Sequence, residues 1–222
     1  TDNFPVVNTT FSDDVYYLVM EEGTWQIGDM KVEAHVDTIS TVGSDDNGWT
    51  GTTTTFDHTY STVPIVLHQV MSNNDSAWIT SFVSRSGDHT NPPSTSSMYL
   101  GLNAAEVSTS NAHAAEEIGW IALENVGTET VDGIELRTYR VSEFARGHQD
   151  GCYSYTHGGT YSTPMAFVTQ NSMDGVDGSW ATICSLSSTS VSMHYDEDNY
   201  HDSERSHTDE AAGMVVFDGS FD

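Results

Sequence analysis

YSTVPIVLHQVMSNNDSAWITSF, residues 60–82, returns in altered form at residues 161–186 as YSTPMAFVTQNSMDGVDGSWATICSL. The aligned identities are Tyr60/Tyr161, Ser61/Ser162, Thr62/Thr163, Pro64/Pro164, Gln69/Gln170 and Trp78/Trp180. Further along, GWIALE from Gly119 matches GMVVFD from Gly213. Matches in the same order predict that the chain holds two copies of one domain.

Both copies have the pattern of β-structure. Short runs rich in β-branched and aromatic residues occur as PIVLHQV at 64–70, AWITSFV at 77–83 and IGWIALE at 118–124. Turn-forming clusters such as SNNDS at 72–76 and DGVDGS at 174–179 separate the runs. This spacing predicts an all-β fold of two tandem antiparallel β-sandwich domains, 25–126 and 127–222, with about six strands each.

The N-terminal region contains an additional strand-like segment. DDVYYLVMEEGT at 13–24 resembles EEIGWIALENVGT at 116–128, the junction between the two copies. Residues 1–24 are therefore predicted to carry an extra strand. It could cover an edge of its own first domain, add to the sheet of a neighbouring subunit, or mark the chain as a slice of a longer tandem array. We favour the second option, with these contact residues: Val15, Tyr16, Tyr17, Leu18, Val19 and Met20.

A family resemblance accompanies this pattern. The order GWTGTTTTFDHTYSTVPIVLHQV at 48–70, AWITSFVSR at 77–85, MYLGLNAAEV at 98–107 and EEIGWIALE at 116–124 resembles the H-type lectin domain. It is also similar to secreted bacterial repeat modules with His-x-x-Glu before a closing strand. The resemblance covers about 30–125 and, more weakly, 130–219. It implies a six-stranded antiparallel sandwich that binds N-acetylgalactosamine-type sugars as a trimer.

The sugar contacts of the lectins have no clear counterpart here. The second copy begins Gly151-Cys152-Tyr153 where the first has Gly48-Trp49. Candidate carbohydrate-binding residues are Trp25, Trp49 and Tyr153. Trp78, Trp120 and Trp180 lie within strand patterns, and we expect them in the core or between sheets.

Acidic residues dominate the charged composition: 33 Asp and Glu face 6 Lys and Arg, giving a formal net charge of −27. Such a chain repels nucleic-acid phosphates and anionic lipid, so neither nucleic acid nor membrane insertion is expected. It attracts cations and stays soluble in salt that screens its self-repulsion. Because aromatic residues make up 10% of the chain and the acids are scattered, we expect a folded protein with acidic solvated faces.

The motif His-x-x-Glu occurs twice, as HAAE at 113–116 and HTDE at 207–210. With one further acid in each copy, the candidate metal ligands are Glu106, His113, Glu116, Glu197, His207 and Glu210. An imidazole and two carboxylates suit zinc, or calcium if oxygen ligands replace the histidine. The alternative, which we favour, is that each glutamate locks a loop to the sheet by a charged hydrogen bond.

Aspartate-rich turns offer a second type of cation site. The candidate calcium ligands are Asp45, Asp46, Asp75, Asp174 and Asp177. Asp, Asn and Gly are also what turns require, and none of these loops matches an EF-hand. No cofactor is expected to be required, and calcium or another divalent cation is the candidate ligand.

A single lysine, many Thr, Ser, Asp and Asn residues and a plausible disulfide together favour an extracellular or cell-surface protein. Cys152 and Cys184 can form one disulfide, which would contribute roughly 3–4 kcal/mol by loop closure. Asn8 and Asn74 begin Asn-x-Ser/Thr sequons and are candidate glycosylation sites.

Enzyme motifs are missing from the sequence, including G-x-S-x-G, the P-loop, the Rossmann fingerprint and C-x-x-C. We therefore predict a non-enzymatic extracellular structural protein that partners with itself in a head-to-tail fibre or surface assembly built by β-strand addition. The alternative is a carbohydrate-binding adhesion module with glycan partners.

Overall fold

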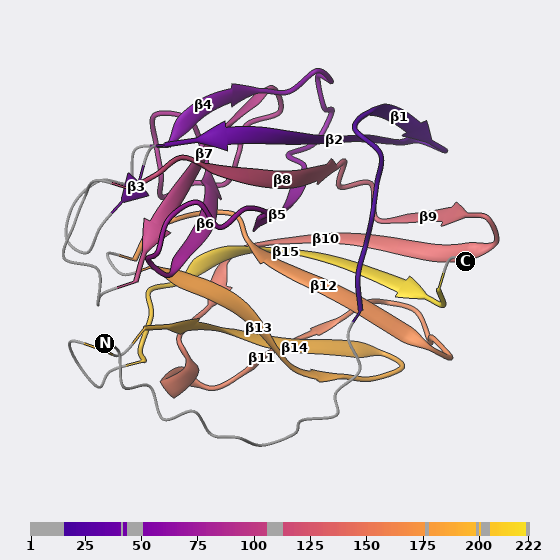
Figure 1. Cartoon of the computed structure of the whole chain (residues 1–222). Helices are drawn as coiled ribbons and strands as arrows, with labels where there is room; N and C mark the ends of the chain where they lie inside the picture. The colour runs from indigo at the N-terminus through magenta and orange to yellow at the C-terminus, as the bar shows by residue number, and fades with distance from the viewer. Residues whose placement is uncertain are drawn as a thin grey trace.

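The structure, a computed structural model, describes residues 16–40, 42–43, 51–105, 113–175, 178–198, 200 and 205–220. It confirms the all-β prediction (Figure 1). The first half contains β1 (Gly23–Ile27), β2 (Met30–Ile39), β3 (Val42–Gly43), β4 (Thr52–Thr55), β5 (Ile65–Val70), β6 (Ile79–Ser84), β7 (Ser97–Ala104) and β8 (Glu116–Leu123). The second contains β9 (Thr128–Val131), β10 (Ile134–Ala145), β11 (Tyr153–Thr156), β12 (Pro164–Gln170), β13 (Ser179–Leu186), β14 (Ser190–Glu197) and β15 (Glu210–Asp218).

The strand order of the first half recurs in the second. One sheet of the first half has the order β1-β2-β8-β5, and its counterpart has the order β9-β10-β15-β12. The other sheet joins β3, β7 and β4, with β6 also paired to β7, and its counterpart has the order β11-β14-β13. The described strands pair in antiparallel fashion except for the short β3–β7 pair, and one isolated parallel bridge joins Gly147 to Tyr195. The sequence repeat is therefore also a repeat of topology.

The four sheets stack in layers (Figure 1). Each half has its own core between its two sheets, built in the first half around Leu100 and Trp120 and in the second around Met193 and Met214. A third cluster, called here the central core, fills the space between the two inner sheets. Its buried members come from both halves: Met30, Val32, Ile65, Leu123, Leu136, Val215 and Phe217.

Strand β15 shows why the sequence AAGMVVF is continuously apolar. Met214 and Val216 face the core of the second half, whereas Val215 and Phe217 face the central core. A strand buried on both faces has no polar face, so its apolar residues do not alternate with polar ones. The fold thereby places the repeat's last strand at the middle of the stack.

A buried asparagine links the two halves. The Asn171 carboxamide donates to the Val66 carbonyl at 2.9 Å and accepts from the Val66 amide at 3.1 Å. The carboxamide thus forms the two hydrogen bonds to β5, an edge strand of the first half, that the backbone of a neighbouring strand would otherwise form. Thr169 donates to the same carbonyl at 3.1 Å. These contacts use backbone groups of β5 that would otherwise be unpaired at the sheet edge.

Several details differ from the sequence-based expectation. Within the described residues the halves contain eight and seven strands rather than about six, because short strands such as β3 and β4 lack a strong apolar signal. The single helical element among the described residues is a 3-10 turn at His148–Asp150. No described helix has the length and apolar character needed to cross a membrane. The predicted domain boundaries remain predictions.

Candidate functional site

Glu116, the last residue of HAAE, fixes the loop that follows β5. Its carboxylate accepts hydrogen bonds from the Ser72 hydroxyl and from the amides of Asn74 at 2.8 Å and Asp75 at 2.7 Å. The hydrogen bond from Ser72, followed by those from Asn74 and Asp75, lowers the pKa of Glu116 despite an opposing effect of burial. The loop-locking alternative accounts for this glutamate.

Glu210, the last residue of HTDE, does the same for the loop that follows β12. It is fully buried and accepts from the Ser172 hydroxyl and from the amides of Asp174 at 2.7 Å and Gly175 at 2.9 Å. The repeated motif therefore marks a repeated loop lock.

The two histidines differ. His113 pairs with Asp75 at 3.3 Å, and its Nε2 is buried without a hydrogen-bond partner among the described residues. His207 lies between two acids, with Nδ1 3.5 Å from Glu197 and Nε2 3.2 Å from Glu210. In the second copy the predicted set of His207, Glu197 and Glu210 is therefore brought together. Glu106 lies outside the described residues.

The contacts of His207 favour its imidazolium form. Ser179 donates its hydroxyl proton to Gln170 at 2.6 Å, so at 3.1 Å it accepts from Nε2 of His207. Burial alone would lower the pKa of His207, but the contacts with Glu197 and Glu210 raise it to about 9. A metal-bound imidazole must offer an unprotonated nitrogen, and here the carboxylates engage opposite ring nitrogens. These contacts account for the buried set of His207, Glu197 and Glu210, and its metal role stays a prediction.

The predicted calcium loops are partly described. Asp75 accepts from the amides of Ala77 and Ala114, each at 2.8 Å, as well as pairing with His113. These hydrogen bonds shape the turn, and calcium binding at Asp75 stays a prediction. Asp174 lines a groove considered below, and Asp45, Asp46 and Asp177 lie outside the described residues.

One of the two sequons is described. The side-chain amide of Asn74 is exposed and donates to the Ala115 carbonyl at 2.8 Å. Asn8 lies outside the described residues. Glycosylation stays a prediction.

An open polar groove of about 620 Å³ lies beside His207 in the second half. It is lined by Arg146, Asp150, Asp174, Ser206, His207, Thr208 and Asp209. Arg146 pairs with Asp209 across it. A smaller hollow of about 240 Å³ shares Arg146, Asp150 and Asp209 and reaches Cys152 and Tyr153. The surface here is acidic, with one arginine.

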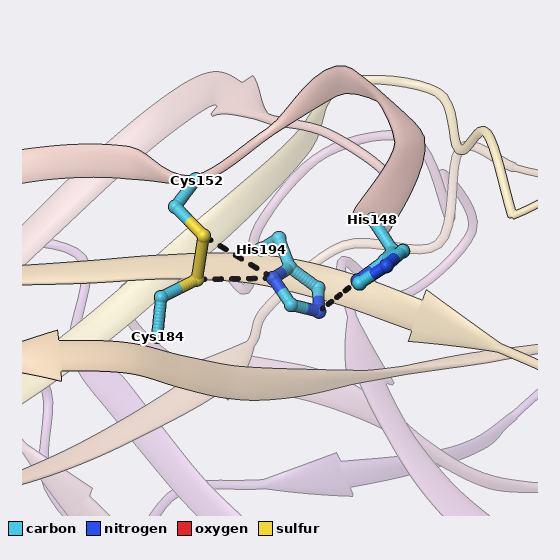
Figure 2. The surroundings of a disulfide bond; sticks show 4 residues. All are labelled: His148, Cys152, Cys184 and His194. Atoms are coloured by element: carbon cyan, nitrogen blue, oxygen red, sulfur yellow. Dashed lines mark hydrogen bonds between the residues drawn. A yellow bond between two sulfur atoms is a disulfide. The ribbon is translucent and has the colours of Figure 1, made fainter.

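The predicted disulfide joins Cys152 to Cys184 at the outer layer of the second half (Figure 2). Figure 2 shows His194 beside it, with Nδ1 3.0 Å from the Cys184 sulfur and 3.6 Å from the Cys152 sulfur. Nε2 of His194 faces Nδ1 of His148 at 3.3 Å. Donor atoms of His148, His194 and Asp196 lie within 4.8 Å of one another.

A second group of donor atoms is Glu33, His35 and Asp57 in the first half. Glu33 is already engaged, accepting from the Tyr60 hydroxyl at 2.7 Å and from the Asp57 amide at 2.8 Å. These contacts account for the fully buried carboxylate.

The tryptophans are distributed differently from the prediction. Trp120 is buried, as expected, and donates to Asp37 at 2.7 Å. The prediction was wrong for Trp78 and Trp180, which are 68% and 44% exposed. These are equivalent positions in the two copies, at the start of β6 and β13, where the outward side of an outer sheet faces solvent. Of the candidate carbohydrate-binding residues, Trp25 and Tyr153 are partly exposed and Trp49 lies outside the described residues.

The described part of the predicted assembly segment, residues 16–20, is not paired with any described strand. Leu18 and Met20 pack partly against the central core, whereas Tyr17 and Val19 are 83% and 82% exposed. In Figure 1 this indigo segment runs across the stack before it enters β1. Val15 lies outside the described residues.

Sequence reasoning missed His148, His194 and Asp196. The only signal in the sequence was that His194 and Asp196 are two residues apart and therefore share one face of a strand. No sequence motif links this pair to His148.

The chain matches no protein-family model, and comparison with curated proteins and with solved structures gives no match. The H-type lectin resemblance stays a prediction.

Proposed function

We propose that this chain is an extracellular structural protein that assembles with itself, with the segment 16–20 as the contact. The observation that carries the proposal is the exposure of Tyr17 and Val19 on a segment that has no strand partner among the described residues. Apolar side chains and unpaired backbone groups are together suited to β-strand addition.

The segment has two distinct sides. Its burial alternates with a period of two, since Leu18 and Met20 contact the central core while Tyr17 and Val19 face away. This is the periodicity of an extended chain. One side thus anchors the segment to its own molecule and leaves the other for a second copy.

Strand β13 is the proposed acceptor edge, since it pairs with β14 and with no other strand among the described residues. Trp180 and Ile183 are exposed on this edge strand, whereas most of the equivalent strand β6 is buried. A segment from one copy that adds to β13 of the next makes a head-to-tail contact between different surfaces, and such contacts build open assemblies. The disulfide at β13 supports an oxidising, extracellular setting.

Charge sets the conditions for assembly. Copies with a net charge of −27 repel one another at low ionic strength. At about 1 M salt the screening length is about 3 Å, so short-range apolar and backbone contacts can dominate. Assembly is therefore expected to increase with salt.

The double substitution Tyr17→Ser and Val19→Ser tests the contact without changing charge or the side that packs on the central core. We expect it to abolish salt-induced assembly, measured by light scattering and by negative-stain electron microscopy. The matched control is Met71→Ser with Val126→Ser, which removes exposed apolar side chains elsewhere and should assemble normally. Assembly of the Tyr17/Val19 variant at the wild-type level would reject the proposal.

Glycan binding is the second candidate function, favoured by the equivalent exposure of Trp78 and Trp180. Flat aromatic faces on an outer surface suit sugar rings, whose C–H groups pack on them. On a glycan array the wild-type chain should bind a defined sugar class, and Trp78→Ala with Trp180→Ala should lose that signal. A blank array for the wild type would count against this function and leave self-assembly unaffected.

A further inference from the structure

We propose that His148, His194 and Asp196 form a binding site for a divalent transition-metal ion of the zinc type. The site lies on the second half, between the 3-10 turn His148–Asp150 and strand β14, next to the Cys152–Cys184 disulfide (Figure 2). It is independent of the proposed assembly segment.

The spacing of the two imidazole nitrogens fits a shared ion. Zinc–nitrogen bonds are about 2.0–2.1 Å, so two ligands of a tetrahedral ion lie about 3.3–3.4 Å apart. Nδ1 of His148 and Nε2 of His194 are 3.3 Å apart. Figure 2 shows the two rings facing each other, with the dashed line joining these nitrogens. A zinc ion could bind both nitrogens with little movement of either ring.

The disulfide orients the ring of His194 for this role. Nδ1 of His194 lies 3.0 Å from the Cys184 sulfur, which has no proton to donate and is a weak acceptor. The contact therefore uses Nδ1–H as the donor, so Nε2 of the neutral ring carries a lone pair directed at His148. Hydrogen bonds that fix the tautomer in this way are typical of metal-binding histidines. His148 is exposed and can hold its own proton on Nε2, leaving Nδ1 for the metal.

Asp196 supplies the third donor from the same face of β14 as His194. Arg205 donates to it through Nε at 2.7 Å and through Nη2, which fixes the carboxylate. A ligating carboxylate with a hydrogen-bonded partner is common around bound metals. Two imidazoles and one carboxylate leave a fourth position for water.

The donor set selects the class of ion. Imidazole nitrogens favour zinc, copper and nickel, whereas calcium and magnesium prefer oxygen ligands. The net charge of −27 raises the local concentration of any cation. It also creates weak, unselective binding to surface carboxylates, which the experiment must separate from the histidine site.

The test is a calorimetric zinc titration of the full, oxidised chain after chelator treatment, with excess calcium present to occupy unselective carboxylates. We expect saturable binding that His148→Ala weakens by about tenfold or more, since losing even an outer-shell partner costs that much. His148 is exposed, so the substitution should leave the circular dichroism spectrum unchanged. His58→Ala, which removes a histidine outside both donor groups, is the matched control.

Cobalt gives an independent readout, because a histidine-bound ion in a tetrahedral site produces visible d–d absorption that His148→Ala should abolish. Equal zinc affinity in wild type and His148→Ala would overturn the proposal. Loss of binding in His35→Ala instead would place the ion at Glu33, His35 and Asp57 and would overturn it equally. Displacement of all bound zinc by calcium would show carboxylate binding only and would also overturn it.

Discussion

Replacing Glu210 with alanine is expected to lower the free energy of unfolding by about 3–5 kcal/mol, the range for removing one partner of a buried ion pair. Glu210 is fully buried and holds the amides of Asp174 and Gly175 together with the ring of His207. The substitution leaves the amides of Asp174 and Gly175 without their acceptor. It also removes one of the two carboxylates that balance the charge of the His207 imidazolium. Urea denaturation, followed by near-ultraviolet circular dichroism, measures the loss.

Two variants isolate the cause. Glu116→Ala removes the equivalent loop lock without a contacting imidazolium, so its loss should be smaller. Glu210→Gln keeps an acceptor for the loop amides but removes the charge. A Glu210→Ala variant within about 1 kcal/mol of wild type would show that the loop lock does not stabilise the fold.

The same site predicts a dependence on pH. The pKa of His207 is raised from an ordinary 6.5 to about 9, so its stabilising effect is complete below pH 6.5 and is lost as pH rises through 9. Stability should therefore fall between these pH values, by on the order of 3 kcal/mol. Glu210→Gln should reduce this slope. A flat profile in the wild type would contradict the imidazolium assignment.

Removal of the disulfide by Cys152→Ser with Cys184→Ser is expected to cost about 3–4 kcal/mol. The two cysteines are separated by 32 residues in the sequence. The expected cost follows from the loop-closure entropy that the unfolded chain regains when the bridge is removed. Thermal unfolding of the variant, without reductant, measures the effect. Both cysteines are exposed, so reduced wild type should behave like the variant.

The control for this prediction is the first half, which contains no cysteine. In single-tryptophan variants, fluorescence from Trp120, buried in the first half, should report little change on reduction, whereas fluorescence from Trp180 on the bridged sheet should report earlier unfolding. An unchanged melting temperature after complete reduction would mean that the bridge does not limit the stability of the second half.

The general fold could be predicted because the sequence repeats its own pattern. Matches such as Pro64 with Pro164 and Gly119 with Gly213 show which residues of the two copies correspond. Apolar runs between turn clusters indicated strands. The structure then repeats the same strand order in both halves. The cysteine pairing was also predictable, since two cysteines allow one bridge.

Other features depend on packing that one sequence does not encode locally. Trp78 and Trp180 lie in apolar runs, yet the side of the sheet that faces solvent is decided by which layer lies opposite, so their exposure was missed. The group of His148, His194 and Asp196 combines a turn with a strand 46 residues away from it in sequence. The contacts of His207 with two carboxylates, one at each ring nitrogen, also depend on the folded arrangement and have no sequence signal of their own.

Sedimentation velocity of the wild-type chain in concentrated salt, over a range of protein concentrations, tests the proposed self-assembly most directly. The proposal predicts a boundary that shifts to larger species as the protein concentration rises. A single monomer boundary at every concentration would contradict it.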